Sequence, residues 1–111
     1  MKNTNHLVFD IKLKEKIKIE NVEKMFDEIV KKIKVRVLKK ENHIFDNGGL
    51  TLFYLLAESH ISGHYRIEDD YLALDIYSCN YLWQIYEEVE NIIKDILSVE
   101  SINTTYLKRW L

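Results

Sequence analysis

Apolar and polar residues alternate near the start of the chain. Between residues 5 and 14, Leu7, Phe9 and Ile11 fall on one face, and the positions between them are mostly polar. A period of two predicts a half-buried strand. Clusters of Asp, Asn, Glu and Gly then mark turns at 46–49 and 68–70. Together these signals predict further strands over residues 35–45, 50–57, 59–67 and 71–78.

Two other stretches repeat their apolar residues every three or four positions, which is typical of amphipathic helices. The first covers residues 21–34, and Asn21 is its expected N-cap. The second covers residues 81–97, with Asn80 as its expected N-cap. The remaining residues, 98–111, are expected to add a short strand and an amphipathic end.

The expected order of elements is therefore β-α-β-β-β-β-α-β. Two helices with one apolar stripe each can cover one face of a mostly antiparallel sheet, so we expect an α/β (α+β) sandwich. A chain of 111 residues is expected to form one domain over residues 1–111. Because the central strands are apolar on both sides, we also expect a homodimer in which two sheets pack into a four-layer αββα arrangement.

Composition narrows the classes of partner and compartment. The net charge is −2, which gives no basic field for a nucleic acid. No apolar run approaches the ~20 residues that a membrane-spanning helix needs. Cys79 is the single cysteine, so it cannot form an internal disulfide, and a reducing cytoplasmic setting is expected.

The segment Ser59-His60-Ile61-Ser62-Gly63-His64 is unusually polar for its place between two apolar strands. On a regular strand, residues five apart face opposite sides, so Ser59 and His64 could meet only if the strand bulges, for example at Gly63. No Gly-x-Ser-x-Gly elbow indicates an ordinary serine hydrolase. The spacing of His60 and His64 falls in a strand pattern without the Glu of a zinc helix, so no metal site is expected.

Residues 56–64 read LAESHISGH, and residues 75–79 read DIYSC. This pair of segments resembles the signature of the short prokaryotic S-adenosylmethionine decarboxylases, and the similarity extends over most of residues 6–97. The resemblance implies self-cleavage between Glu58 and Ser59, giving a β chain, 1–58, and an α chain, 59–111. It further implies that Ser59 becomes a pyruvoyl cofactor, which forms a Schiff base with S-adenosylmethionine, and that the product serves spermidine synthesis.

The same resemblance implies roles for five more residues. His64 matches the histidine that assists processing, and Thr51 stands where the family usually has a serine that hydrogen-bonds the oxyanion. Cys79 matches the proton donor of the decarboxylation. Phe45 matches an aromatic residue that stacks on adenine, and Glu68 matches a glutamate suited to the ribose hydroxyls.

The chain departs from the family pattern beside the expected substrate site, where Tyr65-Arg66-Ile67 replaces Thr-Trp-Pro. An added arginine leaves open a pyruvoyl decarboxylase of arginine or ornithine. A non-catalytic homologue that binds a ligand or regulates a partner is a further alternative. Such a homologue would need none of Ser59, His64 and Cys79, so their joint presence favours an enzyme.

Overall fold

The computed structural model describes residues 3–79 and 84–110. Its elements follow the predicted order, with one short 3-10 turn added. They are β1 (Asn3–Leu13), α1 (Ile19–Ile33), β2 (Val37–Ile44), β3 (Leu50–Leu56), β4 (Ser59–Arg66), η1 (Ile67–Asp69), β5 (Tyr71–Ser78), α2 (Tyr86–Ile96) and β6 (Val99–Trp110).

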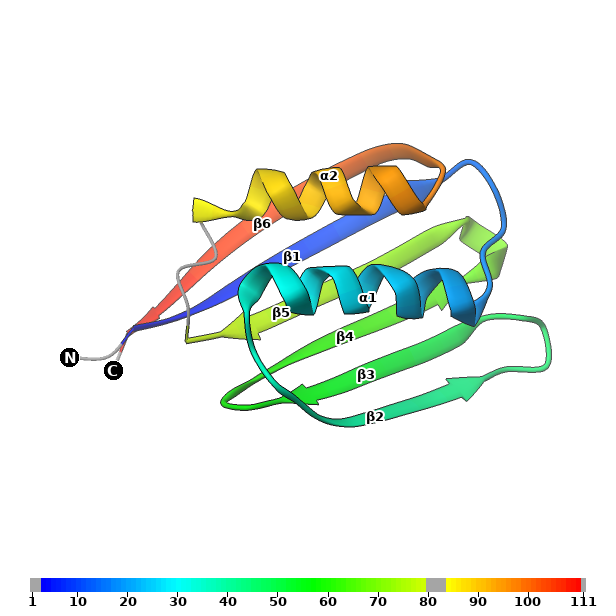
Figure 1. The fold of residues 1–111 in the computed structure, drawn as a ribbon. Helices are drawn as coiled ribbons and strands as arrows, with labels where there is room; N and C mark the ends of the chain where they lie inside the picture. Colours follow the sequence, from blue (N-terminus) through cyan, green and yellow to red (C-terminus); the bar gives the residue numbers. More distant parts are fainter. Residues whose placement is uncertain (1–2, 80–83, 111) are drawn as a thin grey trace.

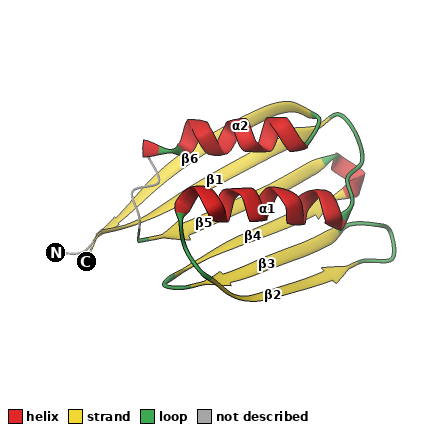
Figure 2. Ribbon diagram, in the orientation of Figure 1, coloured by secondary structure: helices red, strands yellow, loops and turns green. Residues whose placement is uncertain are grey.

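The strands form one six-stranded sheet in the order β2-β3-β4-β5-β1-β6. Every pair of neighbouring strands is antiparallel. Both helices lie on the same face of this sheet, α1 over its middle and α2 over β1 and β6 (Figures 1 and 2). The predicted sheet with two helices on one face is confirmed.

The hydrophobic core lies between the sheet and the two helices. The strands alternate as predicted, and the side chains of Leu7, Phe9 and Ile11 are fully buried on the helix-facing side. The apolar stripe of α1 closes the core from above, through Val22, Met25, Phe26, Ile29, Val30 and Ile33. Burying each such side chain contributes roughly 1.5–3 kcal/mol, which makes this layer the main source of stability.

On the other side of the sheet, the open face, no helix of the described residues lies over the strands (Figure 1). Alternation along β4 places His60, Ser62 and His64 there, and Leu55 on β3 is 42% exposed. A second copy of the chain on this face, as in the predicted four-layer dimer, stays a prediction.

Both helix starts differ from the sequence expectation. Helix α1 begins at Ile19, and Asn21 is its third residue rather than its N-cap. The Asn21 side chain still satisfies the helix start, because its Oδ1 accepts the backbone N–H of Lys18 at 2.9 Å. Asn80 and residues 81–83 lie outside the described residues, whereas Gln84 and Ile85 are described and precede helix α2.

The prediction of a short final strand was wrong. Strand β6 runs for 12 residues, Val99–Trp110, and pairs with β1 along almost its whole length. Strand β6 continues the alternation of β1, since half-buried Ile102 pairs with Ile11 and the more exposed Tyr106 pairs with Leu7. Because the residues between them are mostly polar, apolar content alone did not predict the full length of this strand.

Strand β4 lacks the bulge at Gly63 that would have let Ser59 and His64 meet. Strand β4 pairs with both neighbours without a register shift, and Gly63 lies opposite Leu52 and Leu74. A Cβ at this position would lie 3.0 Å from Cζ of Phe26 on α1. Gly63 therefore allows close packing of helix against strand, and β4 stays straight.

Candidate active site

The candidate residues form two groups at opposite ends of β4. The Ser59 cluster consists of Glu58, Ser59 and Cys79, and the His64 cluster consists of Phe45, Thr51, His64 and Glu68. His64 follows Ser59 by five positions along a regular strand, so the two residues lie about 16 Å apart at ~3.3 Å per residue. Within one protomer, the straight strand keeps the two groups apart.

The Ser59 cluster is built on a very tight loop between β3 and β4. Leu56 pairs with Ser59, so only Ala57 and Glu58 make the turn. Glu58 has a φ of 64°, in the left-handed region that favours glycine. A non-glycine residue held there costs of the order of 1–3 kcal/mol. One strained residue thus lies directly before Ser59, and Lys34 and Asp70 adopt the same region elsewhere in the described chain.

Two hydrogen bonds surround the Glu58–Ser59 peptide. The Ser59 hydroxyl, on a residue only 6% exposed, donates to the carbonyl of Ala57 at 3.3 Å. The thiol of Cys79 donates to the carbonyl oxygen of Glu58, with Sγ and O 3.6 Å apart. A donor on this oxygen draws electron density from the carbonyl carbon and stabilises negative charge that develops on it.

Two buried polar residues near this end of the sheet were not singled out from the sequence. Asn5 and Ser78 are each 1% exposed and pair across β1 and β5. Ser78 precedes Cys79, and the hydroxyl of Tyr106 donates to Oδ1 of Asn5. Alternation along the first strand could have identified Asn5 from the sequence, because Asn5 falls on the same inward face as Leu7. A polar residue at a core position marks a polar site within an apolar layer.

The His64 cluster lies at the other end of β4. Thr51 and His64 are paired across β3 and β4, and Thr51 Oγ1 lies 3.0 Å from His64 Nδ1. These two candidate residues are therefore in hydrogen-bonding contact on the open face. The imidazole ring of His64 is exposed.

A cavity of about 510 Å³ lies at the same end. It is lined by Phe45, Asp46, Asn47, Gly49, Tyr65, Arg66 and Glu68. The Asn47 side chain donates to Glu68 Oε1 at 3.1 Å, which holds this carboxylate at the wall. Phe45 is 51% exposed, and its ring meets that of His43 edge-on, with centroids 4.5 Å apart. Both residues expected to bind the substrate thus line one hollow.

The added Arg66 also lines this cavity, and it has an acidic partner. Its Nη2 lies 3.0 Å from Oδ2 of Asp69, three residues along the chain. Both side chains are more than half exposed, so the pair contributes little to stability.

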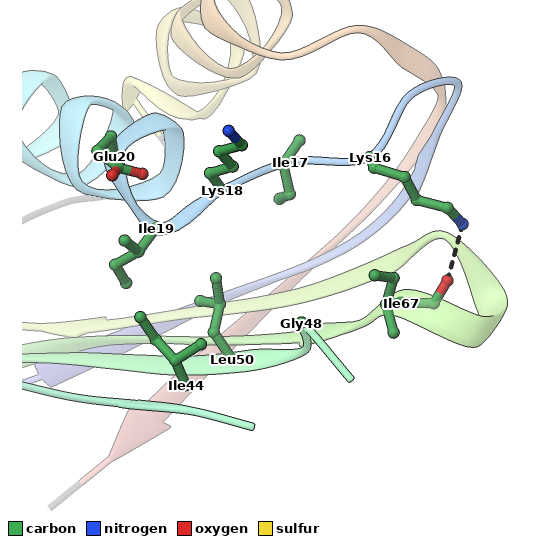
Figure 3. A pocket seen from close by; sticks show the side chains of 9 residues that line it. All are labelled: Lys16, Ile17, Lys18, Ile19, Glu20, Ile44, Gly48, Leu50 and Ile67. Carbon is green, nitrogen blue, oxygen red and sulfur yellow. Dashed lines mark hydrogen bonds between the residues drawn. The ribbon is translucent and has the colours of Figure 1, made fainter. Parts of the chain in front are cut away.

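A second cavity, of about 410 Å³, lies on the helix-facing side of the β2–β3 hairpin (Figure 3). Ile19, Ile44 and Leu50 point toward one another across it, and the Lys16 amine reaches the Ile67 carbonyl at 3.0 Å. The amine of Lys18 points away from this space. None of the candidate site residues lines this aliphatic hollow.

In the part of the chain that the structure describes, no group of three or more His, Cys, Asp and Glu side chains could hold a metal ion. Within the same residues, no helix combines the length and the apolar character needed to cross a membrane.

Comparison with known proteins gives consistent matches. The model of the S-adenosylmethionine decarboxylase family matches residues 5–110. An S-adenosylmethionine decarboxylase proenzyme of Sulfurihydrogenibium sp. is 36% identical over 78 residues, which cover 70% of this chain. The corresponding proenzyme of Methanococcus maripaludis is 32% identical over 88 residues, covering 79% of this chain and 71% of that protein.

The crystal structure of the adenosylmethionine decarboxylase from Aquifex aeolicus has the same fold. It superposes with a TM-score of 0.79 at 22% sequence identity, and the match covers 100% of this chain and 94% of that one. The matched regions span 59% and 57% of the lengths of the Sulfurihydrogenibium and Persephonella marina proenzymes. With a family model that matches nearly its whole length, this chain belongs to the S-adenosylmethionine decarboxylase family.

Proposed function

We propose that this chain is a proenzyme that cuts itself between Glu58 and Ser59 and then decarboxylates S-adenosylmethionine. The observation that carries the proposal is the geometry of one peptide bond. Its carbonyl belongs to the strained Glu58 and accepts the Cys79 thiol at 3.6 Å, and its nitrogen belongs to the hydroxyl-bearing Ser59. Strain before the bond and a donor on its oxygen both favour attack at this carbonyl.

Cleavage begins when Oγ of Ser59 attacks the Glu58 carbonyl carbon. The C–N bond breaks as the new C–O bond forms, so the peptide becomes an ester and the nitrogen becomes an amine. Removal of the Ser59 α-proton then breaks the Cβ–O bond, which releases Glu58 as a carboxylate and leaves dehydroalanine at position 59. Water then displaces the nitrogen, which leaves as ammonia. The water oxygen becomes the oxygen of a ketone at the start of the α chain, 59–111.

The residues around this position fit a pyruvoyl group. Its ketone would accept the electrons released when CO2 leaves the substrate, as a pyridoxal ring does in other decarboxylases. Once Glu58 has become a chain end, the thiol of Cys79 is free to return a proton to the substrate carbon. This role requires a reduced cysteine, which fits a cytoplasmic enzyme.

The cavity at the other end of β4 fits the nucleoside half of S-adenosylmethionine. The exposed ring of Phe45 offers a face for adenine, and Glu68 accepts hydrogen bonds from vicinal hydroxyls of a ribose. Its volume of about 510 Å³ is suited to a small-molecule ligand. The decarboxylated product would supply aminopropyl groups for spermidine.

A homodimer would bring the two halves of the site together. The Ser59 and His64 clusters lie about 16 Å apart in one protomer, too far for a single substrate to engage both and for His64 to assist cleavage. A twofold axis through the open face would place the Ser59 end of one sheet on the His64 end of the other. Each dimer would then hold two complete sites, and the uncovered apolar side chains would be buried.

Intact-mass spectrometry of the purified chain tests the self-cleavage. The wild type should give two fragments split at Glu58/Ser59, with position 59 lacking its amine. The Ser59→Ala variant should stay whole, and Ser62→Ala, a hydroxyl three residues along the same strand, should cleave normally. A wild type that remains one full-length mass after long incubation would rule out the pyruvoyl mechanism.

The substrate is tested on the cleaved protein. Carboxyl-labelled S-adenosylmethionine, arginine and ornithine are supplied separately, and released CO2 is counted. We expect release from S-adenosylmethionine alone. Release only from arginine or ornithine would keep the pyruvoyl chemistry and overturn the substrate, with Arg66 as the first residue to replace.

A further inference from the structure

Three aromatic rings stack across neighbouring strands on the open face, directly beside Ser59. His60 on β4 lies between Phe53 on β3 and Tyr77 on β5. Its ring centroid is 5.6 Å from that of Phe53, at an interplanar angle of 28°, and 5.5 Å from that of Tyr77, at 25°. His6 on β1 meets the other side of Tyr77 edge-on, at 6.2 Å and 79°.

This stack gains importance once the chain is cut, and the inference rests on the proposed self-cleavage. In the uncut chain, the loop of Ala57 and Glu58 ties β3 to β4. Cleavage removes that tie and turns residue 59 into a chain end. The first residues of a chain fray unless side chains or hydrogen bonds hold them. His60 is the first residue after the new end, and its ring is held on both sides.

The stack also connects the new chain end to the proton donor. Tyr77 pairs directly with His60 across β4 and β5, and it precedes Cys79 by two residues. Contact between these two rings therefore fixes the start of β4 against the end of β5. Those are the two segments that carry the ketone and the thiol.

We propose that His60 is a positioning residue, which holds the cofactor-bearing end of the α chain in register with Cys79 through its stack between Phe53 and Tyr77. It touches neither the substrate nor the reacting atoms. The two histidines of the SHISGH segment thus differ in function: His64 pairs with Thr51 at 3.0 Å and assists cleavage, and His60 keeps the cleaved end in place.

The stack should matter after cleavage more than before it. In the uncut chain, the loop itself holds Ser59 next to Cys79, so loss of the ring should leave cleavage nearly complete. In the cut chain, a freer residue 59 should reach the aligned geometry less often. This lowers kcat and leaves the nucleoside cavity, and hence KM, nearly unchanged.

The test compares His60→Leu, which fills the space without a stacking ring, with His60→Phe, which restores the stack without an imidazole. Each variant is first checked for cleavage by intact mass. The cleaved proteins are then assayed for kcat and KM with S-adenosylmethionine, and for amide hydrogen exchange at residues 61–63. Tyr77→Leu removes the same contact from β5 and guards against a folding defect peculiar to one variant.

We expect His60→Leu and Tyr77→Leu to cleave, to lose about tenfold in kcat and to change KM by less than about twofold. Their amides at 61–63 should exchange about tenfold faster, and His60→Phe should stay within about twofold of the wild type in every measurement. Cleaved His60→Leu with wild-type kcat and exchange would overturn the proposal. So would a His60→Phe variant as impaired as His60→Leu, because the imidazole itself would then be required. A wild type that does not cleave would overturn the proposed function, and this inference with it.

Discussion

The two ends of β4 prepare the chain for chemistry in different ways. At the Ser59 end, the backbone is the reactive part: Glu58 has a left-handed φ of 64°, and its carbonyl oxygen receives a thiol. At the His64 end, the backbone is a regular ladder and the side chains are prepared. Thr51 is paired with His64, and a cavity holds Phe45 beside Glu68.

Under the proposed function, neither end is an active site alone. The peptide to be cut lies at the Ser59 end, whereas the histidine expected to assist cleavage and the cavity expected to bind the nucleoside lie at the other end. A straight β4 keeps them about 16 Å apart in one protomer. Under the proposed function, the two ends are half-sites of one shared active site, and the contribution of each can be tested separately.

The largest effect is expected from the exposed histidine. His64→Ala should slow self-cleavage by at least about 100-fold, since general acid–base catalysis contributes about 10²–10⁴. His64→Ala should leave the unfolding midpoint close to that of the wild type, because its ring lies outside the core. Fragment formation against time, followed by intact mass, measures the rate.

Mixed dimers show which protomer supplies this histidine. Ser59→Ala and His64→Ala chains are each expected to remain whole when alone. When they are mixed through unfolding and refolding, the His64→Ala chain should be cut by the His64 of its Ser59→Ala partner. Failure to recover any cleavage in the mixture would contradict a site shared between protomers.

A smaller effect is expected at the cavity. Phe45→Ala should raise KM for S-adenosylmethionine about tenfold, because an aromatic stack is worth about 0.5–1.5 kcal/mol beyond its buried area. Cleavage should be nearly unaffected, since the ring is 51% exposed and carries no group that moves a proton. Phe45→Tyr keeps the ring and is the matched control. Equal KM values for all three proteins would remove Phe45 from the binding site.

Local pattern was enough to predict most of the fold. Alternation and helical periodicity predicted the order of the elements, and the strand over residues 71–78 has the predicted bounds. These signals depend on neighbours within one element, which a sequence displays directly. The pairing of Thr51 with His64 was not predicted, because it depends on the register between β3 and β4.

Features that depend on distant parts of the chain were not predictable in this way. Gly63 is required by the ring of Phe26, which approaches from a helix 37 residues earlier in the sequence. Asn5 and Ser78 become neighbours only when β1 pairs with β5. The distance between Ser59 and His64 required knowing that β4 is straight, and no residue in the segment reports this by itself.

The backbone strain at Glu58 should lower the free energy of unfolding, so relieving it should have a measurable effect. In the Ser59→Ala background, which cannot cleave, Glu58→Gly should raise the free energy of unfolding by about 1 kcal/mol, because glycine adopts φ of 64° without a steric penalty. Ala57→Gly, at the other loop position, should lower it through chain entropy. Urea titration of both variants checks the sign. A destabilising Glu58→Gly would show that the loop holds no strain.

The smallest expected effect is a pH dependence of the folding stability, and it comes from His60 beside Ser59. Burial holds the pKa of His60 below its ordinary value, the nearby His6 lowers it further, and Asp75 opposes the shift. The unfolded chain therefore takes up a proton near pH 6.5, whereas folded His60 does so only at lower pH. Stability from this group is complete above about pH 6.5 and falls as the pH drops below it.

Phenylalanine at position 60 isolates this contribution. Urea midpoints of the Ser59→Ala protein should decrease between pH 7.5 and 5.5, and adding His60→Phe should make the decrease shallower, because one proton-linked group is gone. The other three histidines are present in both proteins, so the difference reports the ring at position 60 together with its electrostatic coupling to His6. If both proteins lose stability in parallel, the His60 ring takes up its proton equally well in the folded and unfolded chains. Its stack beside Ser59 would then be open to water, unlike the covered contact that the positioning role requires.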